Sequence, residues 1–138
     1  PDWALRRLAR AEIVALPHKR FSIEKEAMLV ARYGYVSLEQ ALGNIDRYRA
    51  EGFDPVCLTA GGLIARRMTP ETQAFNQLWW TESQTFWGGR DQPSLPYCAW
   101  RTGLRIGHLQ GTIAANRYAA WRVPIDQPSR AMTAEAAC

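Results

Sequence analysis

The chain has 138 residues, of which 47% are hydrophobic, and it carries a formal net charge of +4. This length and composition suffice for one domain with a packed core and exclude a disordered chain. No apolar run approaches the roughly 20 residues that a membrane-crossing helix needs, and no basic and apolar leader opens the sequence, so we expect neither a transmembrane segment nor a secretion signal.

Arginine supplies almost all of the positive charge, with fifteen arginines against two lysines. The guanidinium group forms paired hydrogen bonds with phosphate or carboxylate, which favours an anionic ligand. The arginines are scattered along the chain, however, so solubility alone is the simpler explanation of the charge. No basic strand with interleaved aromatic residues follows Arg66 and Arg67, and we therefore expect no nucleic-acid partner.

The cysteines indicate the redox compartment. Cys57, Cys98 and Cys138 are odd in number and lack the spacing of metal ligands. This pattern argues against a disulfide framework and against a zinc site. It predicts reduced thiols and a cytoplasmic location.

Hydrophobic periodicity and capping residues divide the chain into short helices and strands. Ser22, Ser37 and Thr69 are each placed to cap a helix, and Ser37 with Gln40 predicts a capping box. The predicted elements are a helix over residues 3–10, a strand over 12–16, helices over 23–33 and 38–51, one or two short strands within 53–68 around a turn at Gly61 and Gly62, a helix over 71–86, a compact helix that begins between 91 and 94, and extended segments at 104–111 and 118–125.

The order of these elements predicts the fold class. A strand, two helices, a strand, two helices and a last strand indicate an α/β fold, with a mixed sheet and flanking helices. We predict a single domain over residues 1–125 and a flexible tail over residues 126–138.

A Gly-Gly break precedes the most promising polar group of the sequence. Gly88 and Gly89 place Arg90, Asp91 and Gln92 just before a helix start, where free backbone N–H groups can hold an anion or a sugar hydroxyl. Asp91 could act as a general base, while Arg90 could bind phosphate or orient the carboxylate. The alternative, which is commoner on spacing alone, is that Asp91 caps the next helix and Arg90 pairs with a neighbouring acid.

Tryptophans surround this break. Trp79 and Trp80 are adjacent on a predicted helix and point about 100° apart, so we expect at least one of them in the core. Trp87 is the candidate platform for stacking against a sugar ring. A plug that covers the end of the core is an equally good interpretation of Trp87.

Two histidines have different expected roles. His18 and Arg20 lie on a loop after a predicted strand, where open α/β sheets collect ligands. His18 is a candidate metal ligand or phosphate contact, with an ordinary loop residue as the alternative. His108 lies between apolar neighbours, and we expect it to make a hydrogen bond in the core.

Three segments in order, residues 15–27, 48–80 and 87–100, resemble the C-terminal part of a glycosyltransferase-like family. That family occurs in bacterial surface-polysaccharide gene clusters, includes plant proteins related to mucilage synthesis, and is similar to nucleotide-sugar transferases of the GT-A type. The resemblance is carried by His18 and Arg20, Glu26 and Ala27, Gly52 and Phe53, Arg66 and Arg67, Phe75 and Asn76, Trp79 and Trp80, and the motif of Arg90, Asp91, Gln92, Ser94, Pro96 and Tyr97.

The resemblance implies an enzyme that moves a hexose from a nucleotide sugar to a glycan hydroxyl in surface-polysaccharide synthesis. It implies the C-terminal portion of a GT-A-like fold, with Asp91 as the catalytic base beside Arg90. Further implied roles are a sugar pocket formed by Trp80, Trp87 and Gln92, and contacts from His18 and Arg20 to the diphosphate or to a divalent manganese or magnesium ion.

One departure from the family pattern bears on activity. GT-A enzymes usually hold the nucleotide and metal with an Asp-x-Asp motif, and this sequence contains none. We therefore expect activity to need an upstream nucleotide-binding half, and peripheral association with a membrane is compatible with this role. The alternative function is a non-catalytic carbohydrate-binding or scaffold domain that keeps the aromatic pocket.

Overall fold

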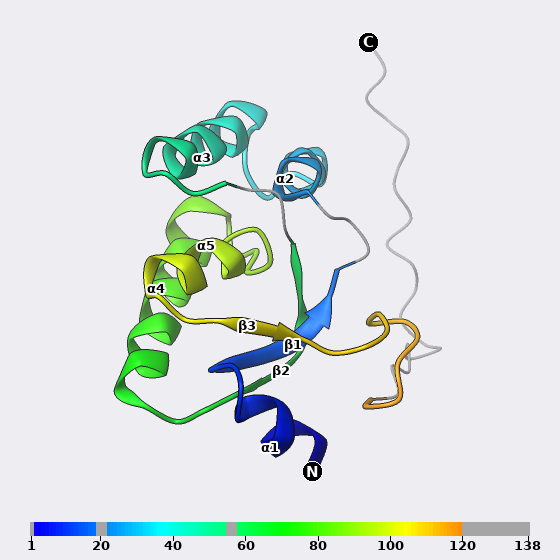
Figure 1. The fold of residues 1–138 in the computed structure, drawn as a ribbon. Helices are drawn as coiled ribbons and strands as arrows, with labels where there is room; N and C mark the ends of the chain where they lie inside the picture. Colours follow the sequence, from blue (N-terminus) through cyan, green and yellow to red (C-terminus); the bar gives the residue numbers. More distant parts are fainter. Residues whose placement is uncertain (1, 19–21, 55–57, 120–138) are drawn as a thin grey trace.

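A computed structural model describes residues 2–18, 22–54 and 58–119 of the chain. In these parts the chain forms a small α/β fold in which helices flank a three-stranded mixed sheet (Figure 1). The predicted order of strands and helices is confirmed, and so is the short helix predicted in front of the first strand. The proposed tail and most of the extended segment at 118–125 lie outside the described residues.

The sheet is built around a buried central strand. Strand β1 (Ile13–Pro17) pairs antiparallel with β2 (Thr59–Arg66) and parallel with β3 (Ile106–His108), which gives the order β2-β1-β3. The first four residues of β1 are fully buried. A strand that is covered on both faces needs a continuous apolar run, and the sequence of β1 supplies it.

Strand β2 contains an irregularity where a turn was predicted. Ala15 pairs with Ile64 and Leu16 with Ala60, so residues 61–63 have no counterpart on β1. The prediction of a turn at Gly61 and Gly62 is therefore wrong, because both glycines lie within one bulged strand. Glycine is common at such bulges, where the backbone bends and other groups approach closely.

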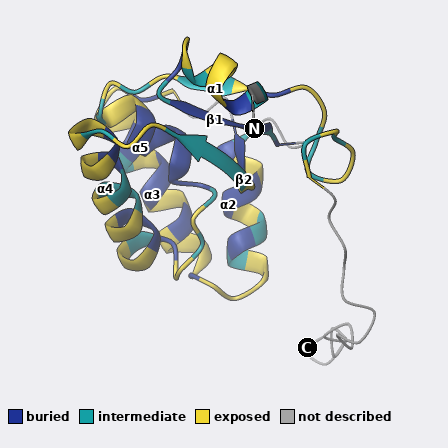
Figure 2. Ribbon diagram, turned by 90° about the horizontal axis from the view of Figure 1, so that it is seen from below, coloured by how far each residue is buried: buried dark blue, intermediate teal, exposed yellow. Residues whose placement is uncertain are grey.

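The helices divide unequally between the two faces of the sheet (Figures 1 and 2). Ile13 packs into the main core with α2 to α5, whereas Val14 and Leu16 belong to a smaller cluster with Leu8 of α1. This division follows from the alternation of side chains along a strand. The helices are α1 (Asp2–Leu8), α2 (Ile23–Arg32), α3 (Leu38–Ala50), α4 (Pro70–Phe86) and α5 (Leu95–Arg101).

The predicted caps set the starts of three helices. Ser22 Oγ accepts from the Lys25 amide at 3.4 Å and Ser37 Oγ from the Gln40 amide at 3.0 Å. The reciprocal capping box forms at Thr69 of α4 and not at Ser37, because the Gln40 side chain donates to the Phe86 carbonyl at 3.5 Å. Local sequence thus fixes the helix starts, while a tertiary contact redirects one side chain.

A buried polar chain ties α3 to α4. Glu82 accepts two hydrogen bonds from Arg47, at 2.6 and 3.1 Å, and a third from the Tyr48 hydroxyl at 3.0 Å. Trp87 Nε1 in turn donates to the Tyr48 hydroxyl at 2.9 Å. Burial of the phenol and its contact with Glu82 raise the pKa of Tyr48, so the hydroxyl keeps the proton that it donates.

The Gly-Gly break predicted after α4 is a sharp turn in which both glycines have positive φ angles, +59° at Gly88 and +85° at Gly89. A Cβ atom added at Gly88 would lie 2.1 Å from the Tyr35 carbonyl oxygen. The turn therefore needs glycine at position 88 for space as well as for backbone conformation.

We expect Gly88→Ala to lower the free energy of unfolding by about 3 kcal/mol, since it adds a backbone clash to the cost of a left-handed conformation. Gly34→Ala is the matched control, because Gly34 also has a positive φ of +75° but no atom within 4 Å of the added Cβ. That control should cost only about 1 kcal/mol. Urea denaturation of both variants measures the difference, and equal losses would contradict the crowding at Gly88.

Candidate functional site

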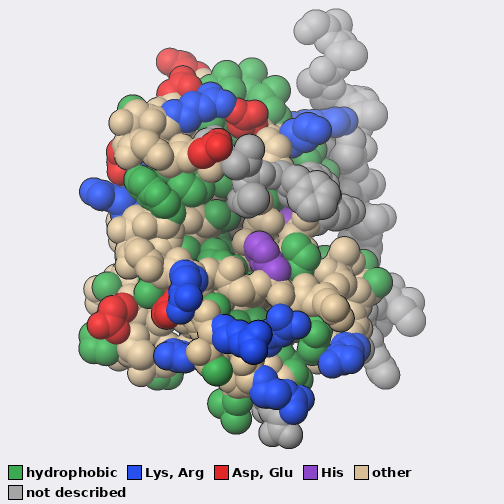
Figure 3. Space-filling view, viewed as in Figure 1, with side chains coloured by type: hydrophobic (Ala, Val, Ile, Leu, Met, Phe, Trp, Pro, Cys, Tyr) green, Lys and Arg blue, Asp and Glu red, His purple; other side chains and the backbone are tan. Residues whose placement is uncertain are grey.

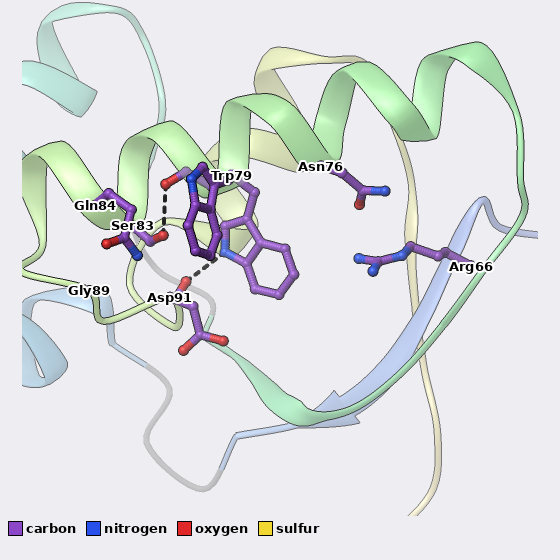
Figure 4. A pocket seen from close by; sticks show the side chains of 8 residues that line it. Arg66, Asn76, Trp79, Ser83, Gln84, Gly89 and Asp91 are labelled. Atoms are coloured by element: carbon purple, nitrogen blue, oxygen red, sulfur yellow. Dashed lines mark hydrogen bonds between the residues drawn. The ribbon is translucent and has the colours of Figure 1, made fainter.

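Two cavities meet at Asp91, beside the turn that follows α4. The first has a volume of about 450 Å³ and the second about 420 Å³, and Asp91 lines both. The first lies between α4 and β2, and the second lies over the bulge of β2 (Figure 4 shows the first). The first is lined by Arg66, Asn76, Trp79, Trp80, Ser83, Gln84, Gly89 and Asp91, and the second by His18, Ala60, Gly61, Gly62, Arg90, Asp91, Gln92 and Ile113.

The backbone of Asp91 is held firmly while its side chain is exposed. Its carbonyl accepts hydrogen bonds from Trp79 Nε1 at 2.7 Å and from Ser94 Oγ at 3.1 Å. Within the described residues the carboxylate makes no hydrogen bond or ion pair, and it lies against Gly61, where an added Cβ would be 3.0 Å from Oδ2. A fixed backbone and an accessible carboxylate suit a proton acceptor.

Arg90 contacts an acidic and an aromatic side chain next to the second cavity. Its Nη2 lies 3.9 Å from Oε1 of Glu26, which is buried, and its guanidinium group lies over the ring of Tyr35 at 5.1 Å. The expected pairing with a neighbouring acid is thus confirmed. Asp91 is not the helix cap, since α5 has Ser94 at that position.

The exposed tryptophan beside the site is Trp80, and Trp87, the predicted sugar platform, is buried. Trp87 is fully buried, with 0% exposure, and its indole N–H is bound to Tyr48. Its ring faces are covered by protein, so the platform role assigned to Trp87 is wrong and the alternative, a plug of the core, is confirmed. Trp80 is 69% exposed and lines the first cavity, whereas Trp79 packs against Phe75 and the core.

The second cavity gathers the polar residues that the sequence singled out. His18, Arg90, Asp91 and Gln92 come together there although 72 residues of sequence separate His18 from Arg90. The His18 amide donates to the Leu58 carbonyl at 3.2 Å, which places His18 at the end of β1. Arg20, the other residue expected beside His18, lies outside the described residues.

Sequence reasoning expected Trp80 in a sugar pocket but did not assign Asn76 or Ser83 to it. Asn76, Trp80 and Ser83 share one face of α4 because they are spaced by four and three residues, and this spacing was a usable signal. Within the described residues, the Oδ1 atom of Asn76 is buried and has no hydrogen-bond partner. Arg66 faces this helix from β2 (Figure 4). The first cavity therefore combines an exposed indole with hydrogen-bonding groups.

His108 lies outside both cavities. It makes the expected hydrogen bond, with Nε2 3.2 Å from Thr59 Oγ1, but its side chain is exposed and not in the core. Desolvation of the ring lowers the pKa of His108 below its ordinary value. The core position expected for it is wrong because β3 is an edge strand.

The described residues do not fit a metal site of the kind that the family implies. Within residues 2–18, 22–54 and 58–119 no group of three or more His, Cys, Asp or Glu side chains could hold a metal ion. The second cavity offers only His18 and Asp91 as ligands, and the cationic Arg90 lines the same space. We therefore derive no step through a metal.

No protein family, curated protein or solved structure matches this chain. None of the helices in the described part of the chain is long and apolar enough to cross a membrane. The chain forms a small α/β fold, and the GT-A assignment stays a prediction.

Substitution of the buried Trp87 and of the exposed Trp80 should change the free energy of unfolding by different amounts. Trp87→Ala should lower the free energy of unfolding by about 3 to 5 kcal/mol, because it empties a fully buried site and leaves the Tyr48 hydroxyl without its donor. Trp80→Ala should change it by less than about 0.5 kcal/mol, because the ring is largely exposed. Guanidinium denaturation compares the two, and a similar loss in both would contradict the division between core and cavity.

Proposed function

We propose that this chain is a glycosyltransferase-type domain in which Asp91 accepts the proton of a glycan hydroxyl while a hexose is transferred from a nucleotide sugar. Surface-polysaccharide synthesis is the setting implied by the sequence resemblance. The observation that carries the proposal is the position of the Asp91 carboxylate on the wall shared by two cavities. One cavity suits the acceptor and the other suits the donor.

The first cavity has the composition of a sugar-binding site. Trp80 supplies a flat, exposed apolar ring, and Asn76 and Gln84 supply amide groups that can bind hydroxyls. Aromatic surface with a few polar groups is the usual composition of small-ligand sites, whose volumes of roughly 300 to 1,000 Å³ include that of this cavity. We assign the acceptor glycan to it.

The second cavity suits the charged end of a donor. Arg90 and Gln92 line it together with His18 at the end of β1. Guanidinium and amide donors bind the oxygens of a diphosphate, and their hydrogen bonds strengthen as negative charge develops on the leaving group. We assign the sugar diphosphate to this cavity, with Arg90 held for this contact by Glu26 and Tyr35.

In the proposed transfer step, each bond that forms is matched by one that breaks, and Asp91 receives the proton. The acceptor hydroxyl attacks the anomeric carbon of the hexose and passes its proton to the Asp91 carboxylate. The bond between that carbon and the diphosphate oxygen breaks, and the nucleoside diphosphate leaves with the electron pair. Asp91 is accessible from both cavities, which this step requires.

Asp91→Asn should lower kcat for hexose transfer about 100-fold to 10,000-fold, because an amide cannot accept the proton. Asp46→Asn, at an exposed position of α3, removes the same charge elsewhere and should leave kcat unchanged. The assay follows labelled hexose from a panel of nucleotide sugars onto glycan acceptors, with this chain and with the chain extended upstream. If the Asp91→Asn variant transfers hexose at the wild-type rate, Asp91 is not the catalytic base. Glycan binding without transfer by any form of the wild type would favour the carbohydrate-binding alternative.

Gly61→Ala tests the positioning of the carboxylate without altering it chemically. The added Cβ would lie 3.0 Å from Asp91 Oδ2, so the carboxylate must shift, and we expect kcat to fall about tenfold or more with little change in stability. Gly107→Ala is the matched control. Gly107 lies on β3 of the same sheet, and its added Cβ would lie 3.1 Å from the Ala11 Cβ, away from Asp91. Equal kcat values in the two variants would show that Gly61 does not position the base.

A further inference from the structure

A third cavity lies beside α1, and its lining residues differ in kind from those of the first two. It has a volume of about 550 Å³ and is lined by Trp3, Arg6, Arg7, Ala9, Arg10, Arg117 and Tyr118. Four of its seven lining residues are arginines and none is acidic. We call it the arginine cavity. The transfer step proposed for Asp91 uses none of its residues.

Helical geometry places three of the arginines on one face. Trp3, Arg6, Arg7 and Arg10 are spaced by three, four and seven residues from Trp3, which aligns them along α1. The helical turn continues beyond Leu8, because the Arg10 amide donates to the Arg7 carbonyl at 3.0 Å. The fourth arginine, Arg117, comes from a segment more than a hundred residues later.

The cavity is held in place from both sides. Arg67, the residue after the end of β2, donates through its Nε to the Leu8 carbonyl at 2.7 Å, which anchors the end of α1 beside the sheet. Trp3 and Tyr118 are in ring contact, with centroids 4.8 Å apart, and both pack against the small cluster of Val14 and Leu16. The arginines thus project from a framework that is fixed at two points.

In the part of the chain that the structure describes, the arginines of this cavity have no acidic partner. Among the described residues, none of Arg6, Arg7, Arg10 and Arg117 forms an ion pair with an acidic side chain, while Arg117 lies over the Tyr118 ring at 5.5 Å. Several of the blue basic side chains in Figure 3 lie close together over the part of the molecule where α1 lies, while others are spread over the rest of this face. Like charges at neighbouring helical positions destabilise a protein, so this arrangement favours a bound anion that offsets them.

We propose that the arginine cavity binds a ligand that carries two or more phosphoryl groups. Guanidinium groups form paired hydrogen bonds with phosphate, which an ammonium group cannot do, and four of them around one concavity match several oxygens at once. The volume lies within the range of small-ligand sites. The same chemistry is presented by a free diphosphate and by phosphorylated lipid headgroups, and this proposal does not depend on glycosyl transfer at Asp91.

Calorimetric titration of the full chain with inorganic pyrophosphate tests the free ligand. Sedimentation with phosphatidylcholine vesicles that contain a phosphatidylinositol monophosphate, whose headgroup carries two phosphoryl groups, tests the lipid source. The double variant Arg6→Gln/Arg10→Gln should weaken binding about tenfold or more. Arg32→Gln/Arg101→Gln, which removes two exposed arginines elsewhere, is the control of equal net charge and should bind within about twofold of the wild type.

Arg6→Lys/Arg10→Lys keeps the charge but loses the paired hydrogen bonds, so it should bind more weakly than the wild type and more tightly than the glutamine variant. Thermal unfolding of each variant confirms that it folds. Binding of pyrophosphate but not of vesicles identifies a soluble ligand, and binding of vesicles alone identifies a lipid headgroup. The proposal is overturned if the wild type binds neither probe, or if the Arg32 and Arg101 control loses binding equally.

Discussion

The buried carboxylate of Glu82 organises the region on which the candidate site depends. A charged group away from water is stable only when its hydrogen bonds are satisfied, and Glu82 obtains them from Arg47 and Tyr48 of α3. Because Tyr48 also accepts from Trp87, the same chain of contacts fixes the residue that ends α4. The position of the following turn is thereby set by the packing of two helices.

The contacts of this turn with the core determine where the residues of the site lie. Trp87 is locked in the core, and Gly88 passes so close to the Tyr35 carbonyl that no side chain fits. The chain must therefore leave the core abruptly, and Arg90 emerges over Tyr35 and toward Glu26. Asp91 follows with its carbonyl bound to Trp79, so its carboxylate is directed to the cavities by contacts on both sides.

The sequence predicted what local interactions decide. The order of elements, the caps at Ser22 and Thr69 and the Gly-Gly break all follow from short-range signals, and the structure confirms them. The bulge in β2 was mistaken for a turn because only its pairing with β1 shows that the strand continues. Local sequence could not decide between a sugar platform and a core plug for Trp87 for the same reason, since its partner Tyr48 lies 39 residues away. The sequence singled out Arg90 and Asp91 as candidates, but the pairing of Arg90 with Glu26 of α2 joins distant segments and has no signal in residue spacing.

One segment that packs on the sheet lines two of the three ligand cavities that we propose. The segment after β3 packs on the small cluster of Val14 and Leu16, with Ile113 lining the second cavity and Tyr118 lining the arginine cavity. The turn from Thr112 to Ala115 is closed by backbone hydrogen bonds of 2.9 and 3.2 Å. One short segment therefore forms part of both walls. Ile113 and Tyr118 therefore hold fixed positions relative to each other, because both side chains rest on the same buried cluster.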